Sequence, residues 1–390
     1  MRSRATFGAT LAMAALAGLL PGTAAGRAGD ILLGTDGNGD VIRMDPGTGA
    51  VSPVASGSPL DSPSGLDFAR DGALFTADYS LPGLVRINPV TGSASVVAEG
   101  PPFFAEPLDV EVGPDGQLYV AEEQGGFEAV LKVDPATGQT EAISPGGLLT
   151  DPYALTIRHR DLVAFVADGS GDQVVGVDLR TGAQQLVSDD PDLDSLQGIA
   201  LAPNGTLYVL DAIDNQILRV DPVTGAATPI TTGGLLSGNA YNIAIEPAGT
   251  IVVANINGNN VVRVDPANGA QSEVGMATSP EGIVVEPPRC AGRLATIVGS
   301  PGRDTLLGSP FPDVIASLGG RDVIRGFKGN DLICSGPGPD RVFGGPGRDR
   351  ILGGPGGDRI LGGPGTDRIL GGAGRDRCVG GPGRDLLRRC

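Results

Sequence analysis

The apolar residues of this chain recur in short runs, and no stripe of helical spacing and useful length follows residue 25. In "GIALAPNGTLYVLD" (residues 198–211), two apolar runs flank a Pro-Asn-Gly turn, and similar pairs recur before residue 288. Helices place apolar residues every three or four positions, whereas strands alternate or, when buried on both faces, run continuously apolar. Since 64 Gly and 32 Pro among 390 residues supply many turns, the pattern predicts an all-β protein.

A second hairpin repeats about every 44 residues up to residue 288. Segments such as "ILRVDPVTGAA" occur six times, and their fifth residues are spaced by 43 to 46 positions: Asp45, Asn88, Asp134, Asp178, Asp221 and Asp265. Each unit thus holds four antiparallel strands, as a propeller blade does. "ILLGTD" near the start matches a second strand and "EGIVVEPP" near the end a first strand, so their pairing would complete a sixth blade. We predict a six-bladed β-propeller over residues 30–288.

The unit "GIALAPNGTLYVLDAIDNQILRVDP" resembles the NHL-repeat and gluconolactonase-like six-bladed propellers. Gluconolactonase-like enzymes hold a divalent metal near the axis with a Glu, an Asn and an Asp. The resemblance therefore implies Glu281 and Asn242 as axial metal ligands, although the third ligand has no clean match. Capping of the tunnel mouth by Tyr153 and Tyr241 would instead favour a binding role. Streptogramin lyases have similar blades but are thought to need two histidines, and this chain has only His159.

Acidic or amide residues end the second strand of every blade. We interpret this ring as structural, because such side chains can accept backbone N–H bonds in the following turn. Its members are Asp36, Asp78, Glu122, Asp168, Asp211 and Asn255.

Beyond residue 298 a nine-residue unit, G-G-x-G-x-D-x-U-x with U apolar, recurs ten times without a break. It resembles the RTX (haemolysin-type) calcium-binding repeat, which implies a parallel β-roll over residues 299–390. Six residues turn and three form a strand, so two units make one coil and U points inward. The carboxylates supply the anionic oxygens that Ca²⁺ prefers, with at most about eight sites between neighbouring coils. The predicted ligands are Asp304, Asp322, Asp331, Asp340, Asp349, Asp358, Asp367, Asp376 and Asp385.

Two features of the repeats depart from that pattern. "GSPFPDVIA" lacks two glycines, so Asp313 is left out of the predicted ligands. Arginine fills the seventh place in five units, at Arg341, Arg350, Arg359, Arg368 and Arg377. Stacked arginines repel one another. They form either a solvated face that pairs with aspartates of empty sites or a docking strip for an anionic cell-surface polymer.

Both ends of the chain indicate export. Arg2 and Arg4 precede an apolar run and small residues up to Ala25, as in a secretory signal peptide over residues 1–25. A retained membrane anchor is the alternative. Four cysteines near the C-terminus predict disulfides in an exported protein. Cys378 and Cys390 are close in sequence, which favours that pair and leaves Cys290 with Cys334.

Charge divides the chain into two parts. Residues 26–298 carry a net charge of −23 and residues 299–390 a net charge of +4, with a linker predicted at 289–298. The acidic first part argues against nucleic acid as a partner. The sequence therefore predicts a secreted, monomeric calcium-binding protein without stable membrane insertion, extracellular or attached to the cell wall. In it the propeller is a binding or scaffold module and not an enzyme. The alternative is a metal-dependent extracellular hydrolase or lactonase.

Overall fold

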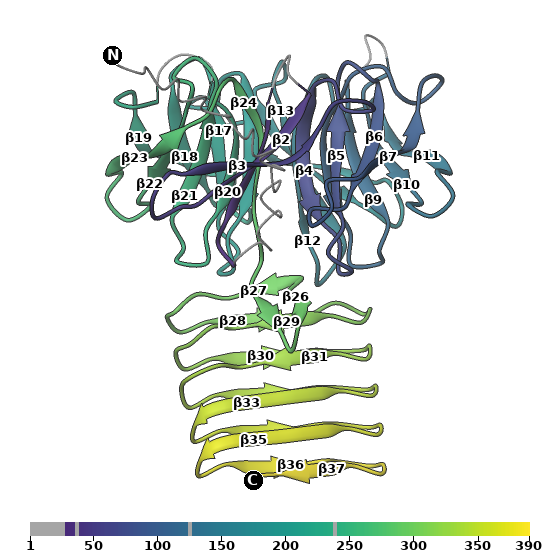
Figure 1. Cartoon of the computed structure of the whole chain (residues 1–390), viewed down its shortest axis with the longest axis vertical. Coiled ribbons are helices and arrows are strands. Elements are labelled where there is room, and N and C mark those ends of the chain that lie inside the picture. The colour runs from purple at the N-terminus through teal and green to yellow at the C-terminus, as the bar shows by residue number, and fades with distance from the viewer. Residues whose placement is uncertain (1–27, 36–38, 124–126, 237–239) are drawn as a thin grey trace, which may run out of the picture.

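The computed structural model describes residues 28–35, 39–123, 127–236 and 240–390, so the predicted signal peptide lies outside the described residues. A ring of blades stands above a stack of flat coils that carries the C-terminus at its far end (Figure 1). The described residues form strands and turns and no helix. The predicted all-β class, a propeller followed by a parallel roll, is confirmed.

The propeller consists of six four-stranded antiparallel sheets. The first blade contains β24 (Pro280–Val285), β1 (Ile31–Thr35), β2 (Asp40–Met44) and β3 (Val51–Ser56). The next two contain β4 (Pro63–Phe68), β5 (Leu74–Asp78), β6 (Gly83–Ile87), β7 (Ala94–Glu99), β8 (Pro107–Val112), β9 (Leu118–Glu122), β10 (Ala129–Val133) and β11 (Thr140–Pro145). The last three contain β12 (Pro152–Arg158), β13 (Val163–Asp168), β14 (Gln173–Asp178), β15 (Gln184–Ser188), β16 (Leu196–Leu201), β17 (Leu207–Asp211), β18 (Gln216–Val220), β19 (Ala227–Thr232), β20 (Ala240–Ile245), β21 (Ile251–Asn255), β22 (Asn260–Val264) and β23 (Gln271–Met276).

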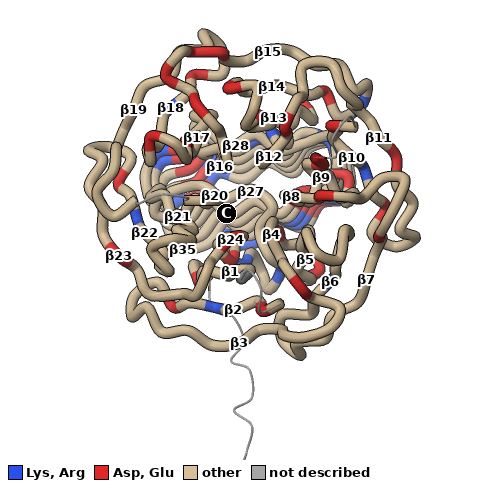
Figure 2. The backbone as a smooth tube through the Cα atoms, turned by 90° about the horizontal axis from the view of Figure 1, so that it is seen from above, with Lys and Arg blue, Asp and Glu red and all other residues tan. Residues whose placement is uncertain are grey.

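The ring closes by pairing the two ends of the propeller sequence. Ile31 lies opposite Val285 and Leu33 opposite Ile283 in the antiparallel pair of β1 and β24. The first strands of the six blades surround the centre (Figure 2). The predicted closing blade is confirmed, and it leaves neither end of the ring as an open edge.

The hairpin between third and fourth strands shows why its Asp and Gly recur. Asp45 Oδ1 accepts the N–H groups of Gly47 and Thr48, both at 2.9 Å. Gly182 has a φ of +71°, and a Cβ there would lie 1.7 Å from the Ile143 carbonyl oxygen of the preceding blade. Only glycine combines that φ with so close an approach.

Three members of the predicted ring accept an N–H from the following turn, as predicted: Asp78, Asp168 and Asp211. Asn255 differs, because its Nδ2 donates to the carbonyl of Leu235. Other bonds of the ring go to the turn before the first strand of the blade. Glu122 Oε1 accepts the N–H groups of Ala105 and Glu106, at 2.7 and 2.8 Å. Asp168 likewise accepts the N–H groups of Thr150 and Asp151, at 2.6 and 3.1 Å. Asp36 lies outside the described residues.

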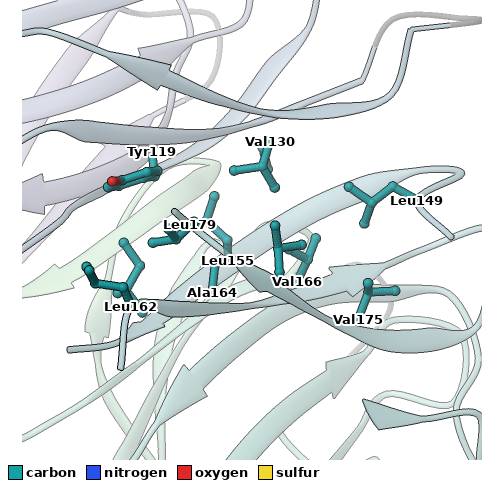
Figure 3. Packing of buried hydrophobic residues seen from close by; sticks show 12 residues of the cluster. Tyr119, Val130, Leu149, Leu155, Leu162, Ala164, Val166, Val175 and Leu179 are labelled. Atoms are coloured by element: carbon teal, nitrogen blue, oxygen red, sulfur yellow. The ribbon is translucent and has the colours of Figure 1, made fainter. Parts of the chain in front are cut away.

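Apolar side chains fill the spaces between adjacent blades. One cluster joins Tyr119 and Val130 of the third blade to Leu155, Val166 and Val175 of the fourth (Figure 3). These strands read as continuous apolar runs because neighbouring blades cover both of their faces.

The roll consists of two parallel sheets wound from alternate repeats. One contains β27 (Ile297–Val298), β29 (Val314–Ala316), β31 (Leu332–Cys334), β33 (Arg350–Gly356), β35 (Arg368–Gly374) and β37 (Leu386–Arg388). The other contains β28 (Thr305–Leu307), β30 (Val323–Arg325), β32 (Arg341–Phe343), β34 (Arg359–Leu361) and β36 (Arg377–Val379). The U residues of the first nine repeats pack between the sheets into one apolar cluster, whereas Leu387 of the last repeat is exposed. The cluster contains Leu306, Ile315, Ile324, Ile333, Val342, Ile351, Ile360, Ile369 and the partly buried Cys378.

The segment between propeller and roll is structured. Its residues form the hairpin of β25 (Arg289–Cys290) and β26 (Arg293–Leu294), followed by β27. Disulfides join Cys290 to Cys334 and Cys378 to Cys390, which are the predicted pairs. None of the described residues forms a helix long and apolar enough to cross a membrane.

Candidate functional site

The repeat aspartates form two ladders along the roll. The N–H of each aspartate donates to Oδ1 of the aspartate one coil further on, as from Asp340 to Asp358 at 3.0 Å and from Asp349 to Asp367 at 2.9 Å. The same bond recurs from Asp304 to Asp322 and from Asp367 to Asp385. One carboxylate oxygen of each acceptor therefore holds the coils together.

The second oxygen, Oδ2, is buried and has no hydrogen-bond partner in six successive repeats. These are Asp322, Asp331, Asp340, Asp349, Asp358 and Asp367. A buried carboxylate oxygen left without a donor or a cation is costly. Burial accordingly raises the pKa of Asp331 to about 7, and those of Asp340 and Asp349 to about 6.

Glycines allow these turns to stack at close distance. Gly365 has a φ of +156°, and a Cβ there would lie 1.5 Å from the carbonyl oxygen of Gly347 in the preceding coil. Proline fits in the third place because it needs no N–H there: the Pro364 carbonyl accepts the N–H of Gly347 at 2.9 Å. Glycine is therefore needed in the fourth place for two reasons: it adopts the positive φ, and it has no Cβ to collide with the preceding coil.

This arrangement suits a hard cation such as Ca²⁺, which takes six to eight oxygen ligands from carboxylates and carbonyls. The six unpartnered oxygens lie in consecutive turns, and the structure brings the predicted aspartates from Asp322 to Asp367 into one regular set. No group of three or more His, Cys, Asp or Glu side chains that could hold a metal occurs among the described residues. A Ca²⁺ ion in these turns would therefore need backbone carbonyl oxygens as ligands in addition to the carboxylates.

The first coil is bonded differently. Asp304 Oδ2 accepts the N–H and Oγ–H of Ser300, at 2.7 and 3.0 Å. Asp313 Oδ2 accepts the same two groups from Ser309, also at 2.7 and 3.0 Å. The repeat pattern left Asp313 out of the predicted ligands and kept Asp304, but the two aspartates make the same serine contacts. These contacts depend on side-chain geometry, which the pattern does not give.

The arginines in the seventh place form columns on the outer faces of the roll. Arg341, Arg359 and Arg377 lie in register on neighbouring strands, which are about 4.8 Å apart in a sheet. Within the described part of the chain, every ion pair lies between residues 30 and 289, so these arginines do not pair with the repeat aspartates. A groove of about 490 Å³ runs along the column and is also lined by Phe343, Leu361 and Val379.

Two tyrosines meet at the propeller axis. The hydroxyls of Tyr153 on β12 and Tyr241 on β20 lie 3.2 Å apart, and their rings contact edge to face with centroids 5.5 Å apart. Asn242, an implied metal ligand, uses its Oδ1 to accept the N–H of Ile243 at 2.7 Å. The tunnel mouth therefore contains the pair of tyrosines, Tyr153 and Tyr241, in mutual contact.

The structure also places three carboxylates beside the axis that the sequence analysis did not connect. Asp67 Oδ2 accepts the N–H of Val112, and Asp109 Oδ2 accepts the N–H of Leu155, so each bonds the next blade. Glu111 accepts the Thr156 hydroxyl at 3.3 Å. Burial raises the pKa of Asp67 to about 6 and that of Asp109 to about 7. Each carboxylate stands 45 or 46 residues before its partner in the next blade, and this spacing was the available signal in the sequence.

A cavity of about 920 Å³ lies between the propeller and the first coil of the roll. Ile157, Leu201 and Val285, near the ends of inner strands, line it together with Thr305 and Leu307 of the roll. The starts of the inner strands, including the tyrosine pair, therefore lie at the face away from the roll. His159, also in the cavity wall, has its pKa lowered to about 4 by burial.

Comparison with known proteins identifies the repeats and the propeller. Residues 307–342, 335–369 and 352–387 match the RTX calcium-binding nonapeptide repeat family. A chain in a crystal structure of a nidogen–laminin complex superposes with a TM-score of 0.57 at 14% identity, covering 65% of this chain and 97% of that chain. A streptogramin B lyase structure gives a TM-score of 0.48 at 18% identity, covering 66% and 78% of the two chains. No curated protein matches the sequence.

At such identities the propeller matches show the fold alone. The fold and the repeats define a six-bladed β-propeller protein with C-terminal RTX-type repeats. Repeats of this family bind calcium, and the combination fits a calcium-binding propeller protein.

Proposed function

We propose that this is an extracellular calcium-binding protein whose roll holds Ca²⁺ in its aspartate turns and whose propeller is a binding or scaffold module. The observation that carries the proposal is the row of six buried Oδ2 atoms without a partner. Cations bound along the two aspartate ladders would satisfy these oxygens and offset the repulsion between stacked carboxylates. Ca²⁺ is abundant outside cells, so the roll would gain its full stability only after export.

The test is a Ca²⁺ titration of the mature full-length chain after chelation, followed by calorimetry and thermal unfolding. We expect several Ca²⁺ ions per chain and a rise in the Tm of the roll, because ligands that bind only the folded state stabilise it. Mg²⁺ is the control, since it demands a tighter octahedral shell and keeps its waters. A chain with the same Tm in chelator and in Ca²⁺, and no heat of binding, contradicts the proposal.

A second role for the roll follows from its arginines. We infer that the column of Arg341, Arg359 and Arg377 docks an anionic cell-surface polysaccharide, with the apolar side chains of the groove beneath the sugar rings. The absence of ion pairs to these side chains among the described residues leaves their charge available to a partner.

Polygalacturonate is a suitable probe for this docking. We expect it to bind the full chain in Ca²⁺, and to bind more weakly as salt rises, because salt screens exposed charges. R341Q/R359Q/R377Q should lose most of the binding, whereas R86Q/R160Q/R180Q on the propeller should keep it. Equal binding by both variants would contradict the role of the column.

A further inference from the structure

The two turns of the first coil, residues 299–316, satisfy their carboxylates from within the same turn. Ser300 and Ser309 each donate an N–H and a hydroxyl to the aspartate four residues later. Both serines stand in the second place of the repeat, and no later repeat has serine there. From Asp322 to Asp367, by contrast, Oδ2 has no partner.

The position of this coil explains the difference. A later aspartate receives an N–H from the aspartate eighteen residues before it, as Asp358 does from Asp340. The residues eighteen positions before Asp304 and Asp313 are Glu286 and Ala295, and their N–H groups donate to the carbonyls of Asp30 and Pro288. Oδ1 of the first two aspartates therefore lacks the usual donor, and the hydroxyls of Ser300 and Ser309 also donate there, at 3.2 and 3.1 Å.

The same coil contacts the propeller. Phe311 stands in the fourth place, where every other repeat has glycine, and it packs against the propeller cluster that contains Tyr119 and Leu162. A side chain there would collide with the preceding coil elsewhere in the roll, as the 1.5 Å approach at Gly365 shows. Arg70 of the propeller is also close enough to Asp313 for electrostatic attraction.

We propose that the first coil is a metal-free docking coil, in which Ser300 and Ser309 close the turns of Asp304 and Asp313, and that calcium binding begins at Asp322. The inference rests on the proposed function, because it assumes Ca²⁺ in the later turns. A cation at Asp304 or Asp313 would have to displace hydrogen bonds that already satisfy the carboxylate. The docking coil holds the roll on the propeller whether or not Ca²⁺ is present.

Counting Ca²⁺ ions on full-length variants by calorimetry tests this. D304N/D313N should bind as many ions as the wild type, whereas the matched pair D340N/D349N, also one residue from each ladder, should bind at least one fewer. S300G/S309G removes both hydroxyl donors and places glycine where later repeats have it at positive φ, as at Gly354, so it should bind at least one more ion. Thermal unfolding in chelator confirms that each variant is folded.

The outcomes separate the two proposals. An equal loss of Ca²⁺ in both asparagine pairs, or no gain in S300G/S309G, overturns the docking coil while leaving the calcium roll in place. A wild-type chain that binds no Ca²⁺ overturns the calcium roll and this inference with it.

Discussion

The backbone N–H of Asp340 donates to Oδ1 of Asp358, eighteen residues later, at 3.0 Å. One oxygen of Asp358 therefore serves the backbone while the other is buried without a partner. The same side chain accepts a hydrogen bond that joins two coils and is also a candidate cation ligand. Loss of the cation would leave the bond in place but expose the roll to repulsion between its carboxylates.

The buried Glu122, at the end of β9, should make the stability of the propeller depend on pH. Burial raises its pKa to about 7, so the folded state binds the proton more tightly than the unfolded state. The free energy of unfolding should therefore fall as pH rises from about 4.5 to 7. E122Q keeps the acceptor for both N–H groups and cannot ionise. In urea unfolding we expect it to match the wild type at pH 4.5 and exceed it by about 1–2 kcal/mol at pH 8, after allowance for solvent screening.

E122A is the matched control for that experiment. It removes the acceptor of the Ala105 and Glu106 N–H groups and should destabilise the propeller at both pH values. An E122Q protein with the same pH dependence as the wild type would show that the pKa of Glu122 does not differ between the folded and unfolded states.

The two disulfides should contribute unequally. Cys290–Cys334 closes a separation of 44 residues and joins the segment below the propeller to β31, whereas Cys378–Cys390 closes only 12. Longer closed loops restrict the unfolded chain more, and removal of a native disulfide costs about 2–5 kcal/mol. Calorimetry should show a larger loss of roll stability in C290S/C334S than in C378S/C390S. A larger loss in C378S/C390S would contradict this prediction and would show that the roll depends more on the disulfide at its C-terminal end.

The apolar ladder of the roll should be as sensitive as a globular core. Ile351 is fully buried, and Ile351→Ala should lower the free energy of unfolding of the roll by about 2–5 kcal/mol. Leu361 is 40% exposed on the outer face, and Leu361→Ala should change it by less than about 0.5 kcal/mol. Denaturant unfolding in saturating Ca²⁺ compares the two. Similar effects would mean that the stacked coils do not depend on a packed interior.

We expect the residues at the tunnel mouth neither to bind Ca²⁺ nor to hydrolyse lactones. E281Q/N242A should bind the same number of Ca²⁺ ions as the wild type, because Asn242 Oδ1 already accepts the N–H of Ile243 at 2.7 Å. Y153F should retain the fold, since the ring contact with Tyr241 persists without the hydroxyl. A loss of one ion in E281Q/N242A, or lactonase activity that disappears with it, would support the metal-dependent hydrolase.

Repeats made much of this molecule predictable. The 44-residue spacing, the match between "ILLGTD" and a second strand, and the unbroken nine-residue unit predicted the blades, the closing pair of Ile31 with Val285, and the coils. Each repeat contacts mainly its neighbours, so periodicity along the chain determines those contacts. The disulfides followed from the positions of four cysteines near the C-terminus.

The sequence by itself therefore determined the architecture and the ladders of aspartates, and it favoured the cysteine pairs that the structure forms. Only the tertiary structure decided that Ser300 and Ser309 bond the first two aspartates, that Phe311 packs against the propeller, and that Tyr153 meets Tyr241. Tyr153 and Tyr241 are 88 residues apart and come together only because the ring closes. The serine contacts depend in turn on where the roll begins. No local period encodes such relationships, because they arise from packing between distant parts of the chain.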